Sequence, residues 1–378
     1  MIDNPTPTFN PIGLDRARLF SLMRARSLDG ILLSSPENVF YTTGYPTLPY
    51  SGNPIVYALR NQLPYYAFIG SDEQVVLLCW GGAAMGIDYG ADDVRMAFTR
   101  QMSEDDLAAL VEEKLQLDCT LGVESTFPYT ALQVLQEHAH PDKFVLVDDL
   151  LLELRLIKSP AEVERIRRST QIVDQTVLEL AHALHLGMSR LDLLHEARWR
   201  MLKNGAHGID HLTVAFGAAN PEVALGELLE ANQIVTLDLG AIYDGYVSDN
   251  RRLVYTGAVP ETLKQLHQKL CWVVAEMGNA LTPGKTFSEL HAHAFELFTQ
   301  AGIDPMFLHV GHSLGLQVEE QWIMADDPTH VQPGMVLNIE LYSPSDDGVM
   351  VGDEETFLVT SSAPEKLSTL PADIIEVR

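Results

Sequence analysis

The 378-residue chain has few cysteines and few basic residues, and both shortages narrow the class of protein that it can be. Cys79, Cys119 and Cys271 are odd in number and widely spaced, so no disulfide framework or cysteine-rich metal knuckle is indicated, and we expect reduced thiols. Twenty-five Lys and Arg against 52 Asp and Glu give a formal net charge of −27. A field of that sign repels polyanions, so we expect no nucleic-acid partner.

Long apolar runs are also missing. No stretch of about 18 or more apolar residues occurs, and no basic segment followed by an apolar one stands at the N-terminus. We therefore expect neither a membrane span nor a secretory signal, and a cytoplasmic location. Hydrophobic residues make up 46% and charged residues 20%, which is typical of globular proteins. The length suits about two domains.

We predict an α/β N-terminal domain over residues 12–152, because segments with helical spacing alternate there with short apolar runs. The helical segments are 17–27 and 130–140, and the strand-like ones are 30–35, 65–70, 74–80, 120–125 and 144–149.

We predict an α+β domain with an internal duplication over residues 158–378. Ser159, Pro160 and Glu162 open its first helix with a capping box and a proline at the first helical position. Two helices followed by strands then occur twice, at similar lengths. The predicted helices begin near residues 160, 189, 261 and 286, and the predicted strands are 212–216, 233–240, 335–341 and 355–360.

Two carboxylates stand in an apolar hairpin around the dipeptide Asp244-Gly245. This dipeptide is a strong signal for a two-residue turn, so Tyr243 should pair with Tyr246. Asp238 then becomes the diagonal neighbour of Asp249 on one sheet face, roughly 7–8 Å away at Cα. Two buried carboxylates so close repel each other unless a cation lies between them. The alternative is a pair of solvent-facing aspartates, which are common in hairpins.

Further ligand types lie downstream in strands or loops of the same domain. His312 follows Gly311, Glu340 lies in one apolar strand, and Glu354 lies in another. Each residue alone also has a plain reading, as a core histidine or a solvated glutamate. Together with the two aspartates they make an oxygen-rich shell with one nitrogen, which suits Mn²⁺ and, less selectively, Co²⁺, Fe²⁺ or Zn²⁺.

These motifs resemble those of the pita-bread metallopeptidases of the aminopeptidase P, prolidase and creatinase group, over nearly the whole chain. Residues 29–45, DGILLSSPENVFYTTGY, are similar to the group's N-terminal signature. Residues 154–167, LRLIKSPAEVERIR, resemble its inter-domain helix entry. The five ligand motifs follow in the group's order. The resemblance implies a creatinase-like N-terminal domain and a pita-bread catalytic domain.

The resemblance also implies roles for single residues. Asp249 and Glu354 would bridge two metal ions, and Glu340 would also serve as the base for the attacking water. Arg252 matches the arginine of the group's Asp-x-x-Arg stretch, which we interpret as orienting a ligand carboxylate; an exposed salt bridge is the alternative. The implied metal ligands are Asp238, Asp249, His312, Glu340 and Glu354, and the implied cofactor is two divalent ions, with Mn²⁺ as first candidate.

The substrate-facing residues depart from the group's pattern. Ala224 and Glu319 stand where the group usually has histidines, and a third histidine is displaced by one position, to His309. Such histidines stabilise the developing oxyanion, and each donor is typically worth ~3 kcal/mol. His309 is our catalytic candidate, and His207 and His211 are further possible replacements; all three also have a structural or solvent-facing reading.

Three functions remain in competition. The first is a dinuclear metal-dependent hydrolase that resembles an Xaa-Pro dipeptidase and acts on small peptides. The second, suggested by the missing histidines, is a non-peptidase of the same fold, a C–N hydrolase or lyase acting on a small amide or zwitterionic metabolite. The third is a binding protein without catalysis. The resemblance further implies a homodimer, in which aromatic residues of a partner edge the active site. The candidates are Tyr41, Tyr45, Tyr50 and Trp80, and core or ordinary surface packing is the alternative that we favour for any one of them.

Overall fold

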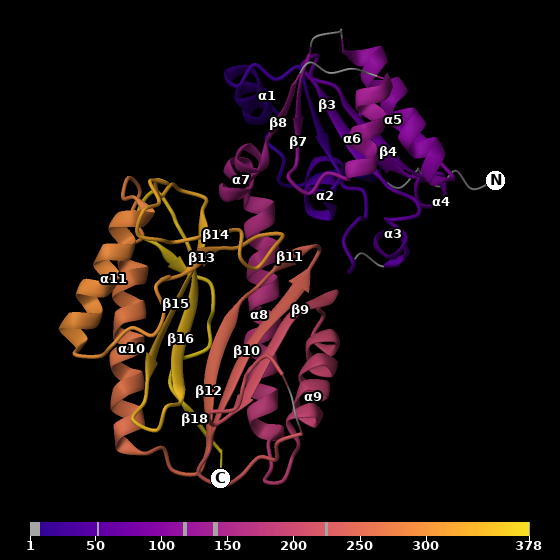
Figure 1. Ribbon diagram of the computed structural model, residues 1–378. Coiled ribbons are helices and arrows are strands. Elements are labelled where there is room, and N and C mark those ends of the chain that lie inside the picture. Colours follow the sequence, from indigo (N-terminus) through magenta and orange to yellow (C-terminus); the bar gives the residue numbers. More distant parts are fainter. Residues whose placement is uncertain (1–7, 51–52, 116–118, 139–142, 224–225, 378) are drawn as a thin grey trace. The chain divides into compact units, whose positions relative to one another are not determined.

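The structure is a computed structural model that describes residues 8–50, 53–115, 119–138, 143–223 and 226–377, shown in Figure 1. The chain divides after Arg155 into two compact units. Ala224, one of the two altered substrate positions, lies outside the described residues.

The N-terminal unit is built around a mixed six-stranded sheet with the strand order β6-β4-β3-β2-β7-β8. The sheet strands are β2 (Gly30–Leu33), β3 (Tyr66–Gly70), β4 (Val75–Trp80), β6 (Asp93–Ala97), β7 (Thr120–Val123) and β8 (Lys143–Leu146), and a separate parallel pair joins β1 (Thr8–Phe9) to β5 (Asp88–Tyr89). The helices are α1 (Arg16–Ala25), α2 (Pro36–Thr43), α3 (Ile55–Ala58), α4 (Gly81–Ala84), α5 (Arg100–Lys114), α6 (Tyr129–His138) and α7 (Asp148–Leu156). The predicted α/β character and the hairpin between β3 and β4 are confirmed.

Two of the aromatic residues predicted to edge a partner's active site belong to the core of this unit. Tyr41 is 2% and Tyr45 0% exposed. The Tyr41 hydroxyl donates to the Gly13 carbonyl, 3.1 Å away, within the same unit. These two rings therefore do not present a surface to a partner, whereas Tyr50 and Trp80 are partly exposed.

The C-terminal unit consists of two halves with the same order of elements, two helices followed by three main strands. The first half contains α8 (Pro160–Ala183), α9 (Arg190–Lys203), β9 (Gly208–Phe216), β10 (Ile234–Tyr243), β11 (Tyr246–Val247) and β12 (Asn250–Thr256). The second contains α10 (Glu261–Ala280), α11 (Phe287–Ala301), β13 (His312–Ser313), β14 (Gln321–Trp322), β15 (Val336–Pro344), β16 (Met350–Leu358) and β17 (Glu365–Lys366), and β18 (Ile375–Val377) returns to pair with β12. Figure 1 shows the strands in the middle of this unit with the helix pairs on its outside.

The helices begin where the sequence predicts and bury the face that it predicts. Ser159 and Glu162 form the capping box of α8, and Thr286 and Glu289 form that of α11, so each pair satisfies backbone N–H groups that lack a partner within the helix. The apolar positions of α8 predicted to share one face are all buried: Val163, Ile166, Val173, Val177 and Leu180. They pack in the cores of this unit because burial of apolar area is the main favourable term in folding.

The predicted hairpin is present in the predicted register. Asp244 and Gly245 have φ angles of 49° and 87°, the positive values that a two-residue turn of this hand requires. Tyr243 pairs with Tyr246 across the turn. Asp238 pairs with Arg251 further along, which makes Asp249 the diagonal neighbour of Asp238 as expected.

Candidate metal centre

The five predicted ligands converge inside the C-terminal unit. Asp238 lies in β10, Asp249 directly before β12, His312 in β13, Glu340 in β15 and Glu354 in β16. Side-chain oxygens of Asp238, Glu340 and Glu354 lie within 4.8 Å of one another. The Nε2 atom of His312 is 3.3 Å from Asp249 Oδ2 and 3.8 Å from Glu340 Oε2. The structure thus brings together side chains that are up to 116 positions apart in the sequence, from Asp238 to Glu354.

Strand pairing explains this convergence. Glu340 and Glu354 stand directly opposite each other on β15 and β16, an arrangement in which like charges destabilise a sheet. His312 reaches the same place because β13 pairs with β15 and because Gly311 has φ 143°. A Cβ at Gly311 would collide with the carbonyl oxygen of Asn338, so only glycine allows the backbone to pass there.

The charges of the site shift the pKa values of its carboxyl groups apart. Burial, and then the charges of Asp249 and Asp238, raise the pKa of Glu340 to about 7. The same causes raise the pKa of Glu354 well above its usual range. Burial also acts to raise the pKa of Asp249, but the charge and hydrogen bond of His211, followed by those of His312, hold it well below its usual value. Such opposed shifts are typical of functional sites.

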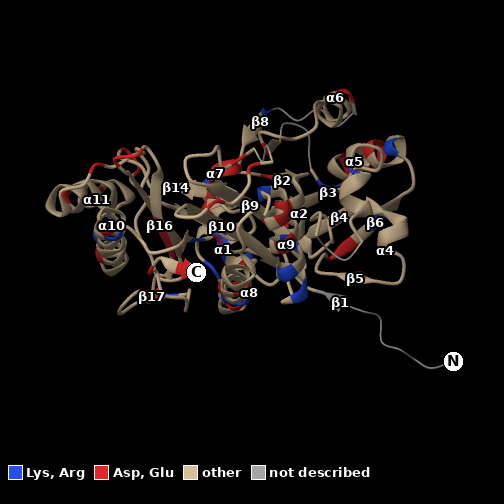
Figure 2. Cartoon of the chain, turned by 90° about the horizontal axis from the view of Figure 1, so that it is seen from below, with Lys and Arg blue, Asp and Glu red and all other residues tan. Residues whose placement is uncertain are grey.

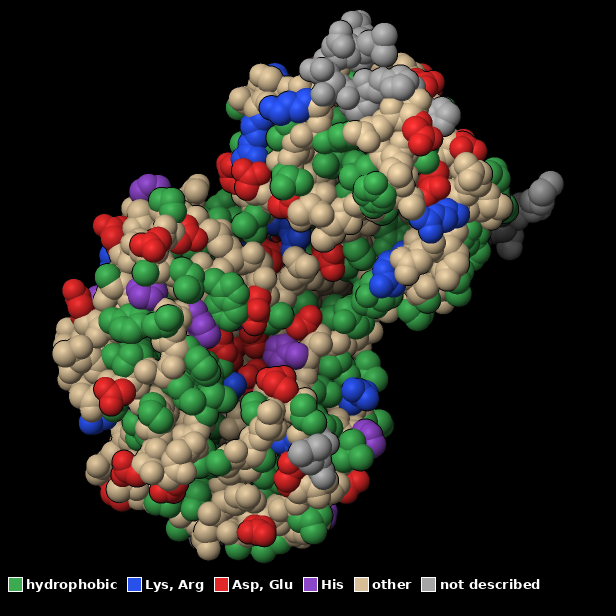
Figure 3. All heavy atoms as spheres, viewed as in Figure 1, with side chains coloured by type: hydrophobic (Ala, Val, Ile, Leu, Met, Phe, Trp, Pro, Cys, Tyr) green, Lys and Arg blue, Asp and Glu red, His purple; other side chains and the backbone are tan. Residues whose placement is uncertain are grey.

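The site fits divalent cations. Glu354 Oε2 and His312 Nε2 are buried without a hydrogen-bond partner among the described residues. Buried polar atoms are nearly always paired, so two such atoms beside three further carboxylates call for a positive partner. Carboxylate oxygens with imidazole nitrogen are the donor set of Mn²⁺, Co²⁺, Fe²⁺ and Zn²⁺ sites. A space-filling view shows acidic side chains gathered in a hollow of this unit with histidines beside them (Figure 3).

The interpretation of Arg252 is wrong, and Arg251 takes the predicted place. Arg252 donates to Glu355 Oε1 at 2.8 Å and to the backbone carbonyl of Glu354 at 3.1 Å, not to a predicted ligand carboxylate. Arg251 donates to Asp238 Oδ2 at 2.5 Å and lies 4.5 Å from the centre of the Tyr342 ring. Side chains alternate along a strand, so Arg251, two residues after Asp249, shares its face, whereas Arg252 points to the opposite face.

The histidines discussed above occupy three different environments. His309 Nε2 is 4.0 Å from Glu340 Oε2, and its ring stacks on Phe307 at 5.3 Å, which places it at the edge of the cluster. His207 binds the exposed turn residue Asp244 and lies outside the cluster. His211 enters the cluster, with Nε2 3.1 Å from Asp249 Oδ1. Glu319 is exposed.

Sequence reasoning missed three polar neighbours of the ligands. Tyr342 donates its hydroxyl proton to Glu340 Oε1, and Asn338 Nδ2 donates to Glu354 Oε1. Both residues lie two positions from Glu340 in β15, and Arg251 lies two positions from Asp249. The period-two spacing of strand faces was the signal that could have found all three.

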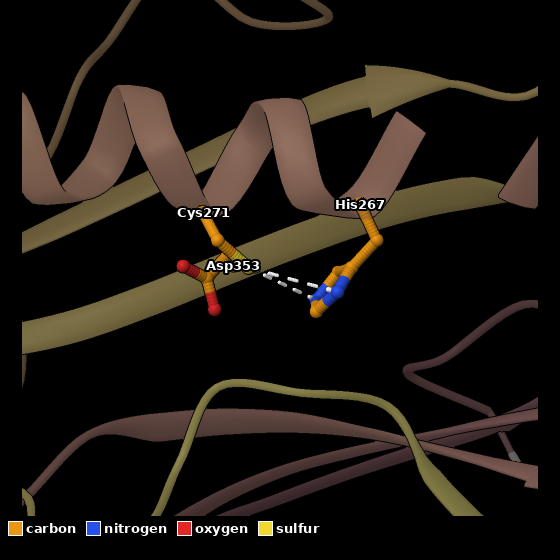
Figure 4. Close-up of side chains that lie close together, drawn as sticks. All are labelled: His267, Cys271 and Asp353. Atoms are coloured by element: carbon orange, nitrogen blue, oxygen red, sulfur yellow. Dashed lines mark hydrogen bonds between the residues drawn. The ribbon is translucent and has the colours of Figure 1, made fainter. Parts of the chain in front are cut away.

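A second group of ligand-type side chains lies on the other face of β16. His267 and Cys271 are one turn apart on α10 and point toward Asp353, as Figure 4 shows. Both ring nitrogens of His267 are 3.6 Å from the Cys271 sulfur. Burial, and then the charge and hydrogen bond of Asp353, raise the pKa of the Cys271 thiol, so without a metal ion the thiol of this cluster keeps its proton. We therefore treat this group as a buried hydrogen-bonded cluster.

Acidic positions are spread over the helices of the molecule, for example in α5 (Figure 2). No helix within the described ranges combines the length and the apolar character needed to cross a bilayer.

The two-halved α+β unit and its buried carboxylate and histidine cluster define the class of the protein, a metal-dependent peptidase with an additional N-terminal domain. The chain belongs to metallopeptidase family M24, whose model matches residues 164–361. The model of the creatinase/prolidase N-terminal domain matches residues 16–157. The resemblance drawn from the sequence motifs is confirmed.

Two dipeptidases are similar to this chain over nearly their whole length. The chain is 26% identical over 367 residues to the Xaa-Pro dipeptidase of Pyrococcus furiosus, covering 95% of this chain and 98% of that protein. It is 25% identical to the Xaa-Pro dipeptidase of Pyrococcus horikoshii, covering 95% and 97%. The crystal structure of the prolidase from Pyrococcus horikoshii OT3 superimposes with a TM-score of 0.81 at 25% identity, covering 95% of this chain and 99% of that one. These relatives favour a peptidase over the non-peptidase and binding-protein alternatives.

Proposed function

We propose that this protein is a dipeptidase that cleaves Xaa-Pro dipeptides with two divalent ions held by Asp238, Asp249, His312, Glu340 and Glu354. The observation that carries the proposal is the convergence of these five side chains in a family of metallopeptidases. Two of their buried atoms, Glu354 Oε2 and His312 Nε2, have no hydrogen-bond partner among the described residues. The family resemblance implies that Asp249 and Glu354 would be shared by the two ions, that Asp238 would be a further ligand of one, and that His312 and Glu340 would be further ligands of the other. We take Mn²⁺ as the first candidate because oxygen donors dominate.

Two divalent ions in such a site lower the pKa of a water molecule and polarise the scissile carbonyl. Glu340 is placed to move the proton. Without ions, burial and the charges of Asp249 and Asp238 raise its pKa to about 7. Bound cations would offset those charges and lower this pKa, so the carboxylate would be ionised and able to accept a proton at neutral pH. The Oε1 atom of Glu340 accepts a hydrogen bond from the Tyr342 hydroxyl, and its Oε2 atom lies 3.8 Å from His312 Nε2. In the proposed reaction this carboxylate takes the proton from the water and passes it to the leaving proline nitrogen.

His309 is the residue we propose for contact with the substrate. It is partly exposed, with 25% of its side chain accessible, and it borders Glu340. Burial and the neighbouring His312 lower its pKa, so the ring is neutral near pH 7 and can donate one hydrogen bond to a carbonyl or carboxylate of the substrate. The aromatic rings of Phe307, Trp322 and Tyr342 surround this part of the site and offer an apolar wall to a proline ring.

The test is hydrolysis of a panel of Xaa-Pro dipeptides, with Xaa-Ala dipeptides and small metabolite amides as comparison substrates, by the purified Mn²⁺-loaded protein. We expect Asp249→Asn to lower turnover by more than about 100-fold, since removing even a group that only hydrogen-bonds a metal ligand costs 10–100-fold in metal affinity or activity. Asp244→Asn is the matched control, because Asp244 lies in the same hairpin but is exposed. Turnover of an amide without turnover of any dipeptide would contradict the proposal.

We also propose a cytoplasmic homodimer. This rests on the family resemblance and on the reduced thiols expected of Cys79, Cys119 and Cys271, which form no disulfide with one another. Light scattering of the purified full chain measures the mass directly, and a monomer would contradict the dimer.

A further inference from the structure

An irregularity in strand pairing directs an additional histidine into the metal centre. In the β9–β10 ladder Leu212 pairs with Leu239 and Ile209 pairs with Ala241, with a register shift between them. Two residues of β9, Asp210 and His211, therefore stand against one residue of β10, Gly240. This is a β-bulge, a feature that re-aims a side chain and that is over-represented beside active sites.

Gly240, opposite the bulge, has no side chain and so leaves room for the ring of His211. A Cβ at Gly240 would collide with the ring of His211, at both Nδ1 and Cε1. Gly240 is two positions from Asp238, so the two residues share the sheet face that carries the ligands. The imidazole of His211 thus lies over the backbone of the ligand-bearing strand, in space that any larger residue at position 240 would fill.

The two ring nitrogens of His211 have the partners of a metal-binding histidine. Nδ1 is 3.0 Å from Asp210 Oδ2. Nε2 is 3.2 Å from Asp238 Oδ1 and 3.1 Å from Asp249 Oδ1. A histidine that binds a metal almost always has its other nitrogen fixed by a carboxylate or carbonyl, as Asp210 does here. Two donor atoms about 2.1 Å from one ion lie roughly 3.0 Å apart at octahedral angles and roughly 3.4 Å apart at tetrahedral angles, and the observed separations fall between these values.

The duplication of the C-terminal unit gives an independent reason. β9 pairs with β10 and β10 with β12 in the first half, as β13 pairs with β15 and β15 with β16 in the second. The second half contributes His312 from β13, the strand at the corresponding place to β9. His211 comes from β9 and points toward the same cluster. The two halves correspond in the order in which their strands pair. Each half then contributes one histidine and two segments that carry a carboxylate.

We propose that His211 Nε2 is a sixth protein ligand, bound to the ion that Asp238 holds, so that each of the two ions has one imidazole. This inference rests on the proposed two-ion function and goes beyond the five ligands that the resemblance implies. It also has a consequence for metal choice. Imidazole at both ions raises affinity for Co²⁺, Ni²⁺ and Zn²⁺ more than for Mn²⁺, because Mn²⁺ suits oxygen donors and stands lowest in the order of stability.

X-ray absorption spectroscopy of the full chain loaded with Zn²⁺ tests the proposal, because scattering from the outer ring atoms counts imidazoles per metal. We expect about one imidazole per ion in the wild type, and about half of that in His211→Ala, in which only His312 remains. Calorimetric titration with Zn²⁺ should show one of the two ions bound more than about 100-fold more weakly by His211→Ala, and about 10–100-fold more weakly by Asp210→Ala, which removes only the partner of Nδ1.

His207→Ala is the matched control, because His207 is a neighbouring histidine that binds the exposed turn residue Asp244. It should leave both readouts unchanged. A wild-type protein that binds two Zn²⁺ ions with half an imidazole each would overturn this inference and leave the proposed function standing. A wild-type protein that binds fewer than two ions would overturn the proposed function itself. The wild-type imidazole count decides the matter even if His211→Ala does not fold.

Discussion

Arg251 and Arg252 are adjacent and both form buried ion pairs, yet they lie on opposite faces of β12, so we expect only the replacement of Arg251 by alanine to weaken ion binding. Arg252 donates to Glu355 at 2.8 Å, to Ser368 Oγ at 3.0 Å and to the Leu370 carbonyl at 2.9 Å, and so ties the C-terminal segment to β12. Arg251 Nη2 donates to Asp238 at 2.5 Å, while its Nε and Nη1 have no hydrogen-bond partner among the described residues.

The magnitudes follow from these contacts. Removing one member of a buried ion pair costs about 3–5 kcal/mol, because it leaves the other charge buried and unpaired. Arg252→Ala should therefore lower the melting temperature of the C-terminal unit by roughly 6–20 °C, at about 2–4 °C per kcal/mol for a unit of this size. Arg251→Ala also breaks a buried ion pair, with Asp238, and should likewise lower the melting temperature. In addition it frees the carboxylate of a proposed ligand from its partner, which should weaken ion binding by about 10–100-fold.

The assays are calorimetric titration with Mn²⁺ for affinity and thermal unfolding monitored by circular dichroism in excess chelator for stability. We expect Arg252→Ala to keep an affinity within a few-fold of the wild type, measured well below its melting temperature. Equal losses of ion affinity in the two variants would refute the assignment of the two side chains to separate faces.

Two further predictions concern single positions. Gly311→Ala should weaken ion binding and cost about 1–3 kcal/mol of stability, because φ is 143° there and the new Cβ would push His312 away from Asn338. Gly348→Ala is the control, because φ is 76° there and nothing lies within 4 Å of the new Cβ. It should leave the ion affinity measured by calorimetry unchanged. Burial lowers the pKa of His267 from 6.5 to about 4. Between these two pH values His267 is protonated in the unfolded chain and neutral in the folded chain. The contribution of His267 is thus fully present above pH 6.5 and is lost as the pH falls toward 4, by about 3 kcal/mol at 1.36 kcal/mol per pKa unit. Urea unfolding at pH 7 and pH 4.5 should show a smaller loss for His267→Gln than for the wild type, and equal losses would contradict this reasoning.

The sequence alone determined much of the fold, for reasons that are local. The Asp244-Gly245 turn fixed the register of its hairpin, so the diagonal placement of Asp238 and Asp249 followed from spacing alone. The capping boxes at Ser159 and Thr286 marked helix starts, because a cap is satisfied within four residues. The ordered ligand motifs indicated the family. The ligand roles of the five side chains stay a prediction that metal binding must test.

Tertiary structure decided which residues surround those five. Arg252 does not orient a predicted ligand carboxylate, because alternate residues of a strand point to opposite faces and Arg252 lies on the face away from the ligands. Tyr41 and Tyr45 are core residues of their own unit. His211 could not be assigned from spacing, since its direction depends on a bulge and on a glycine 29 positions further along the chain. Turns and caps are set by neighbours in sequence, whereas the direction of a side chain into a shared site is set by the strand packed beside it, and only folding brings that strand there.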